Sequence, residues 1–432
     1  MSEITKKDPA KHKGDDFERE IKRFAESIDC LLISLPSVMA TMEVAVNKQQ
    51  AEFMALLKAS GAQQTIEDNT IKFSLSGPNA ANVIKQERAL NNNLTAYRLI
   101  HRSFLTSQIS QYDAYLGRLL RLVFLVHPDK LNSSEKQFTF KELVQYQTLE
   151  EAREALIERE VDTVVRKSHE DQVAWIKTNL KLPVTEFVPE LPDFIEIAQR
   201  RHLFVHCDGV VSAPYIANCS GAGVKLPQEV VLGHQLEVTR EYLEQAFEIV
   251  YAVGVKIGFA VWLNLFKQDA DQAAKCLNAL AFDLIANSRY SLATNLLAFA
   301  LSGKTKPTEE ILFRFLILNL AQCHKWRGDN ATCSRILGER DWSACSDDIK
   351  LAVAVLQDRF DDAIPLIRKL RHEPVFKKEF YQDWPIFRGL RKEARFLACY
   401  KEIYGEEFAH HTVVSTKADG PALPTSNPPG AK

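Results

Sequence analysis

Residues 193 to 212 read Asp193-Phe-Ile-Glu-Ile-Ala-Gln-Arg-Arg-His-Leu-Phe-Val-His-Cys-Asp-Gly-Val-Val-Ser212. The pattern predicts a short amphipathic helix, because Asp193 and Glu196 have the spacing of a capping box and Gly209 can adopt the left-handed conformation that ends a helix. Four ionisable side chains gather near its predicted end: Arg201, His202, His206 and Asp208. Ionisable groups among apolar neighbours cost free energy unless they are paired. We therefore expect these four residues to form a functional site.

The spacing of Arg201 and His206, with a polar residue directly after the arginine, resembles the Arg-x4-His motif of the HEPN family (higher eukaryotes and prokaryotes nucleotide-binding proteins). The resemblance covers roughly residues 92 to 266, and the run from Arg200 to Gly209 is its specific part. On one helix Arg201 and His206 lie roughly 140° apart around the axis. In the family, two copies of the motif meet across a dimer. The resemblance therefore implies a homodimer formed through this helical domain.

The resemblance also implies a metal-independent endoribonuclease, in which the 2′-hydroxyl group of RNA attacks the neighbouring phosphate. His206 would transfer a proton as general acid or base, for which an ordinary pKa near 6.5 is suited. Arg201 would stabilise the extra negative charge on phosphorus, and His202 and Asp208 would support them. Neither a cofactor nor a metal ion is expected. The implied role is a regulated toxin or antiviral defence effector that acts on RNA in the cytoplasm.

Three other interpretations stay open. In a structural one, Arg201 pairs with a carboxylate such as Asp113, and His206 stabilises the carbonyl end of the helix. In a second, His202, His206 and Cys207 bind zinc, since His-x3-His is a metal-binding spacing on a helix. In the third, the helical domain is a catalytically silent scaffold that only dimerises, while C-terminal repeats bind a peptide.

Length and composition limit the classes of protein. A chain of 432 residues exceeds the size of one hydrophobic core, which predicts two or three domains. The net charge is -2, so RNA would have to meet a local basic patch. The eight cysteines contain no CxxC pair and are typical of reduced thiols in a cytoplasmic protein. Residues 1–14 contain no apolar core of a signal peptide. Residues 249–266 are apolar apart from Lys256. A lysine in the middle of a membrane-spanning helix is costly, so we predict a buried core helix here and expect no membrane contact.

We predict an all-α fold, a HEPN-like four-helix up-down bundle followed by a short tetratricopeptide-like solenoid. The predicted parts are residues 1–91, a mostly helical N-terminal extension; 92–268, the HEPN-like helical domain; 269–405, the tetratricopeptide-like repeats; and 406–432, a disordered tail. Residues 1–15 are also expected to be disordered.

Within these parts the apolar spacing predicts individual elements. They are helices over residues 16–57 (interrupted near Pro36), 94–126, 149–180 and 236–266, a short strand over residues 70–75, and a loop over residues 210–233.

The C-terminal third shows a repeated pattern of short helices. Two sets of residues have nearly the same spacing: Tyr290, Ala293, Leu297, Ala300 and Phe360, Ala363, Ile367, Leu370. This spacing resembles tetratricopeptide repeats, in which a small residue lets two helices approach. The resemblance implies about three repeats, a closing helix over residues 384–404 and a protein or peptide partner.

Overall fold

The computed structural model describes residues 13–61, 63–67, 70–74, 80–133, 138–373 and 376–408. Most of the two termini predicted to be disordered, residues 1–15 and 406–432, lies outside these ranges. The described chain is all-α, as predicted, apart from one hairpin of two short strands. It divides into two compact units, residues 1–317 and 318–432.

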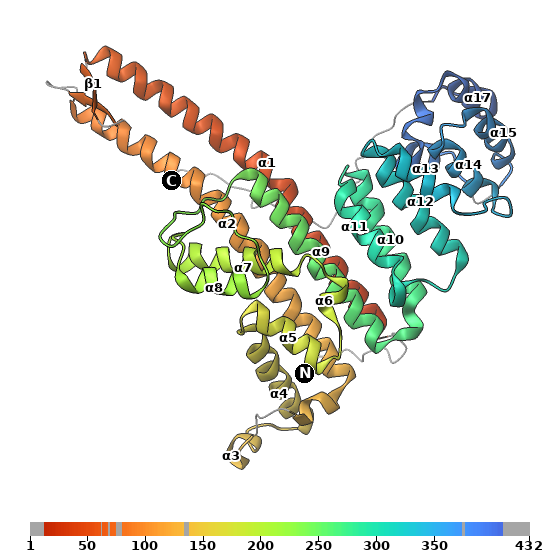
Figure 1. Ribbon diagram of the computed structural model, residues 1–432, viewed down its shortest axis with the longest axis horizontal. Helices are drawn as coiled ribbons and strands as arrows, with labels where there is room; N and C mark the ends of the chain where they lie inside the picture. The colour runs from red at the N-terminus through yellow and green to blue at the C-terminus, as the bar shows by residue number, and fades with distance from the viewer. Residues whose placement is uncertain are drawn as a thin grey trace, which may run out of the picture. The chain divides into compact units, whose positions relative to one another are not determined.

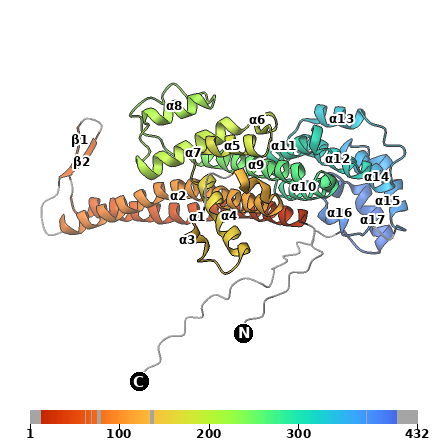
Figure 2. The same ribbon diagram turned by 90° about the horizontal axis from the view of Figure 1, so that it is seen from below.

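The first unit begins with two long helices, α1 (Gly14–Ala59) and α2 (Ala80–Val126), which lie side by side and extend past the other helices of the unit (Figure 1). Figure 2 shows β1 (Gln63–Glu67) and β2 (Thr70–Ser74) at their far end, paired as an antiparallel hairpin. The strand predicted from residue 70 is therefore confirmed. The predicted start of the second helix near residue 94 is wrong, because α2 begins at Ala80 and the expected domain boundary after residue 91 falls inside it.

The predicted interruption at Pro36 is also wrong, since α1 continues through it. Proline removes one backbone hydrogen bond from a helix and costs about 3 kcal/mol in its interior. In α1 Pro36 is exposed, and the buried side of the helix next to it contains Leu32, Leu35 and Met39. The packing of this buried side offsets the missing hydrogen bond.

The core helix of the first unit is α9 (Arg240–Leu265). Both α1 and α9 are long and apolar enough to cross a membrane, but the apolar stretch of α9 is 83% buried in the protein against 22% for α1. This burial confirms the predicted core helix. Lys256 in its middle donates to both carboxylate oxygens of Glu190, at 2.8 and 3.0 Å. Burial of Lys256 lowers the pKa of its ammonium group, and Glu190 opposes that shift.

Two glycines let other helices approach α9 closely. A Cβ atom at Gly254 would overlap the ring of Phe24 from α1, and one at Gly258 would overlap the hydroxyl of Tyr115 from α2. That hydroxyl donates to the carbonyl of Gly254 at 3.3 Å. As a result α1, α2 and α9 pack against one another in a helical bundle.

Shorter helices follow α2 in the first unit: α3 (Phe140–Leu143), α4 (Leu149–Val165), α5 (His169–Asn179), α6 (Val184–Phe187), α7 (Leu191–His206) and α8 (Ala213–Gly221). Of these, α4 and α7 pack on the bundle. The single helix predicted over residues 149–180 is wrong, because the helix breaks between α4 and α5. Ser168 lies in this break and caps α5, since its side chain accepts a hydrogen bond from the backbone N–H of Asp171 at 3.2 Å. The loop predicted over residues 210–233 contains α8, which Ser212 caps in the same way.

Three helix pairs follow: α10 (Ala270–Ala286) with α11 (Tyr290–Ala300), α12 (Glu310–Trp326) with α13 (Asn330–Gly338), and α14 (Asp347–Leu356) with α15 (Phe360–Leu370). The same turn joins the helices of each pair. Its residues with positive φ are Ser288, Gly328 and Asp358, at 62°, 84° and 56°. The next residue donates to the carbonyl five positions earlier, at 2.8, 2.9 and 2.8 Å. This is the Schellman turn that satisfies carbonyls at a helix end.

The chain ends in α16 (Phe380–Asp383), two short 3-10 turns (Pro385–Arg388 and Leu390–Lys392) and α17 (Ala394–Tyr404). The predicted closing helix is therefore present only over its second half. Helix pairs are observed as expected, whereas their assignment to the tetratricopeptide class stays a prediction.

Candidate functional site

Helix α7, which packs on α2 and α9, carries the predicted site at its C-terminal end. The predicted capping box is wrong: the helix begins at Leu191, and no side chain caps it. Glu196 cannot reach back to the helix start because its side chain points inward and is 8% exposed. The predicted end is confirmed, since Gly209 has a φ of +84° and its N–H donates to the carbonyl of Leu203 at 3.0 Å.

Glu196 is the centre of a buried polar cluster, the Glu196 cluster, with Arg200, Tyr215 and Tyr242. Its carboxylate accepts from Arg200 Nε at 2.7 Å and from the hydroxyls of Tyr215 and Tyr242 at 2.6 Å each. The guanidinium of Arg200 also lies over the ring of Tyr242, at 4.0 Å. Burial and the Glu196 carboxylate raise the pKa of both tyrosines, so they remain protonated donors. The cluster ties α7 to α8 and α9.

The opposite side of α7 holds Arg201, His202 and His206, which together with Asp208 we call the motif cluster. His202 and His206 are exposed, and their ring centroids are 4.5 Å apart. Burial, followed by the influence of His206 and Arg201, lowers the pKa of His202 below its ordinary value of 6.5. His202 is therefore mainly neutral at neutral pH and can accept a proton.

Arg201 points toward α2. Its Nη2 lies 3.9 Å from Oδ2 of Asp113, while the other oxygen of Asp113 is 3.1 Å from Nε2 of His169. The Arg201 Nε is buried and has no hydrogen-bond partner in the described part of the chain. The pairing with Asp113 that the structural interpretation expects is thus present as a long ion pair. It leaves donors of the guanidinium unused.

Asp208, directly after the helix, has a φ of +50° and binds Arg102 of α2 at 2.5 Å. The guanidinium of Arg102 lies 4.8 Å from the ring centroid of Phe204. Arg102 is the residue that the sequence analysis missed. The sequence places Arg102 on the predicted helix over residues 94–126. No local pattern connects it with Asp208, which lies 106 positions later in the chain.

The structure thus divides the four predicted residues among three sets of contacts. Arg201 faces Asp113, the two histidine rings contact each other at a tilt of 48°, and Asp208 binds Arg102. Among the residues that the structure describes, no group of three or more His, Cys, Asp or Glu side chains is placed to hold a metal ion. The zinc interpretation of His202, His206 and Cys207 therefore has no support from the geometry.

Fold and site together define an all-α protein whose short helix α7 presents an arginine and two histidines beside a long helical pair. No protein family, curated protein or solved structure matches the chain.

Proposed function

We propose that the chain is a metal-independent endoribonuclease of the HEPN type, a regulated toxin or antiviral defence effector of the cytoplasm. The observation that carries the proposal is the pair of exposed histidines whose rings are in contact beside a guanidinium whose donors are only partly used. RNA contains its own nucleophile, so a protein needs only to move protons and to stabilise negative charge at phosphorus.

In the proposed reaction the 2′-oxygen attacks phosphorus as a base removes its proton, and the 5′-oxygen leaves with a proton from an acid. His206 supplies one of these proton transfers. Arg201 donates to the phosphoryl oxygens, where the planar guanidinium suits two oxygens at once. His202 and Asp208 are supporting residues, His202 by its contact with the His206 ring and Asp208 by holding Arg102 at the site. The products are a 2′,3′-cyclic phosphate and a free 5′-hydroxyl.

The proposal includes a homodimer formed through the helical domain. Arg201 and His206 project from α7 in directions roughly 140° apart, and Arg201 faces Asp113 of its own chain. A second copy could bring its histidines to the arginine of the first. The helix pairs from residue 270 onward would bind a protein or peptide that regulates cleavage or selects its target.

The test uses the purified full-length chain and a labelled single-stranded RNA. His206→Ala and Arg201→Ala should each lower the cleavage rate on the order of 100-fold, the usual effect of losing an acid, base or charge-stabilising group. Matched controls are His127→Ala and Arg166→Ala, which alter a histidine and an arginine that pair locally with Asp129 and Asp162. These controls should cleave at the wild-type rate.

Three further readouts separate this chemistry from others. EDTA should leave the rate unchanged, DNA should remain intact, and the products should carry cyclic phosphates. Loss of activity in EDTA, or products with a 5′-phosphate, would contradict the proposal.

A catalytically silent scaffold is the second candidate, favoured by the contact that ties Arg201 to Asp113. In that case Arg201 and the histidines serve packing and solubility, and dimerisation is the function of the helical domain. A folded, dimeric protein without RNA cleavage, as judged by light scattering and the RNA assay, would support this candidate over the nuclease.

A further inference from the structure

A cavity of about 650 Å³ lies between α5, α6, α7 and α8, away from the motif cluster. Its volume falls in the range of pockets that bind small organic molecules, roughly 300 to 1,000 Å³. Most lining side chains are apolar, among them Val173, Val188, Leu191, Ile195 and Ala217. Glu170 is the one charged residue in this lining, which contains no Lys, Arg or His from the described chain. The cavity therefore combines an apolar wall with a single negative charge.

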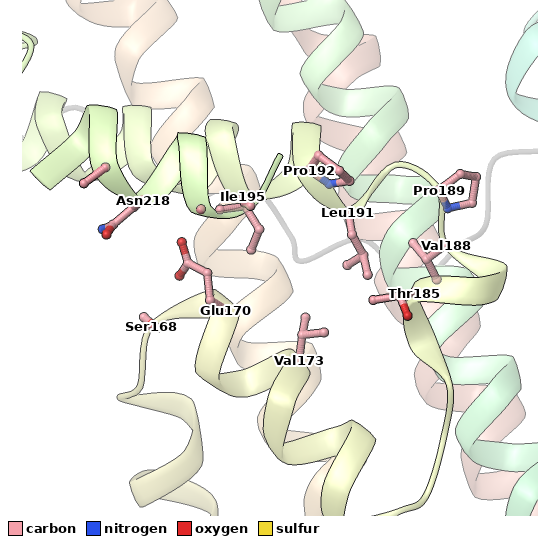
Figure 3. A pocket seen from close by; sticks show the side chains of 13 residues that line it. Ser168, Glu170, Val173, Thr185, Val188, Pro189, Leu191, Pro192, Ile195 and Asn218 are labelled. Carbon is pink, nitrogen blue, oxygen red and sulfur yellow. The ribbon is translucent and has the colours of Figure 1, made fainter. Parts of the chain in front are cut away.

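Glu170 lies in the first turn of α5, and Figure 3 shows its carboxylate directed toward Ile195 and Asn218 across the cavity. One oxygen, Oε1, accepts from Nε2 of Gln199 at 3.1 Å. The other, Oε2, is shielded from water and has no hydrogen-bond partner among the described residues. An ionised carboxylate can accept about four hydrogen bonds, and a shielded oxygen without any is costly. The Glu170 residue as a whole is half-buried and lines the cavity, so a rotation of its carboxylate would present this oxygen to a cationic donor that enters, and the cost would be removed.

We infer that this cavity is a binding site for a small organic ammonium compound, an apolar body that ends in a protonated amine. The ammonium group would donate to Glu170, and the amide oxygen of Asn218 could accept a second of its hydrogens. The apolar body would cover Ile195, Leu191 and Val173. Phosphates and carboxylates are disfavoured ligands, because Glu170 would repel them and no basic lining residue would pair with them. This site is separate from the proposed nuclease chemistry and does not depend on it.

The cavity shares α7 with the motif cluster but uses its other end. Leu191 and Ile195 belong to the first turns of the helix, whereas Arg201 to His206 form its last turns. Binding can therefore be measured on the full chain without reference to RNA cleavage.

Three probes of nearly equal shape test the charge preference by calorimetry at pH 7: phenylpropylamine as its ammonium ion, phenylpropanol and phenylpropionate. The amine should bind at least about tenfold more tightly than the alcohol, as expected for a hydrogen bond with charged partners, and the carboxylate should bind most weakly. Equal binding of amine and alcohol to the wild-type protein, or no binding of the amine at millimolar concentration, would overturn the inference.

Two variants locate the site. Glu170→Gln keeps the shape but removes the charge, and it should reduce the preference for the amine over the alcohol to about twofold or less. Glu186→Gln, an exposed acid of α6 outside the lining, is the matched control and should keep the preference. Ala217→Trp, on the exposed side of α8, should fill the cavity and weaken both ligands at least about tenfold. An amine preference that survives Glu170→Gln, or unchanged binding in Ala217→Trp, would show that the ligand binds elsewhere.

Discussion

Arg200 and Arg201 are neighbours on α7, yet their surroundings are opposite. Arg200 donates to the Glu196 carboxylate at 2.7 Å and lies over the ring of Tyr242. Each residue of the Glu196 cluster has a partner within the cluster. Arg201 has a single long contact of 3.9 Å with Asp113, and its buried Nε is unsatisfied within the described chain. The same side chain therefore stabilises the fold on one side of the helix and keeps donors available on the other. Unused donors of this kind are more typical of sites that act on a ligand than of packing.

The largest expected effect is on the Glu196 cluster. Glu196→Gln should lower the free energy of unfolding by about 3 to 5 kcal/mol, because it leaves Arg200 buried without its counter-charge. Chemical denaturation of the purified protein measures this loss. Asp208→Asn is the matched control on the other side of α7 and should cost less than about 1 kcal/mol. Equal losses of unfolding free energy in the two variants would show that the Glu196 cluster stabilises the fold no more than the motif cluster does.

The second prediction compares the adjacent arginines directly. Arg200→Ala should cost about 2 to 3 kcal/mol of stability, since the buried Glu196 carboxylate loses its counter-charge, the Glu237 carbonyl a donor and the Tyr242 ring its cation. Arg201→Ala should cost about 1 kcal/mol or less, because a single long ion pair contributes little. Thermal and denaturant unfolding of both variants under one set of conditions gives the comparison. A larger loss from Arg201→Ala would place Arg201 in the packing and favour the scaffold function.

A smaller effect is expected for the ion pair between Arg102 and Asp208. The Asp208 side chain is 85% exposed, so Arg102→Gln should cost less than about 1 kcal/mol, and high salt should abolish the difference. Unfolding at low and at high ionic strength measures both effects. If the loss persists at high salt, the contact of Arg102 with the Phe204 ring, not the charge, is the source.

The smallest effect concerns the titration of His202. Its pKa is lower in the folded protein than the ordinary 6.5, so below that pH the unfolded chain binds more protons and is favoured. The contribution to stability is complete above pH 6.5 and is lost as the pH falls through the lower folded value. Melting temperatures from pH 8 to pH 5 should therefore fall slightly less in His202→Gln than in the wild type. NMR titration of the His202 ring should show a midpoint below 6.5, and a midpoint above it would contradict the prediction.

The local sequence predicted several features correctly because their causes are local. The left-handed Gly209 ends α7, and the apolar run around Lys256 forms a core helix. The alternation from residue 70 forms a strand, and the C-terminal helices come in pairs. The sequence also carries a local signal for α8, since Ser212 followed by Pro214 is typical of a helix start.

Other features depended on residues far apart in the chain. Pro36 is tolerated in α1 because packing of the buried side of the helix next to it offsets the lost hydrogen bond. Glu196 was expected to cap a helix, but the hydroxyls of Tyr215 and Tyr242 turn it inward. Helix propensity and caps are weak compared with the burial of apolar surface and of paired charges, so tertiary contacts overrode them in both places.

The sequence by itself determined that the protein is helical, that it contains paired short helices, and that an arginine, two histidines and an aspartate gather at the end of one helix. Only the tertiary structure decided that Arg200 has a close carboxylate partner while Arg201 keeps donors unused, that Arg102 joins the site, and that the cavity between α5 and α8 has one carboxylate among its described lining residues. The physical reason is range. Helix period and chain-reversing turns arise from neighbours in the sequence, whereas the partners of a buried charge come from segments that meet only after folding.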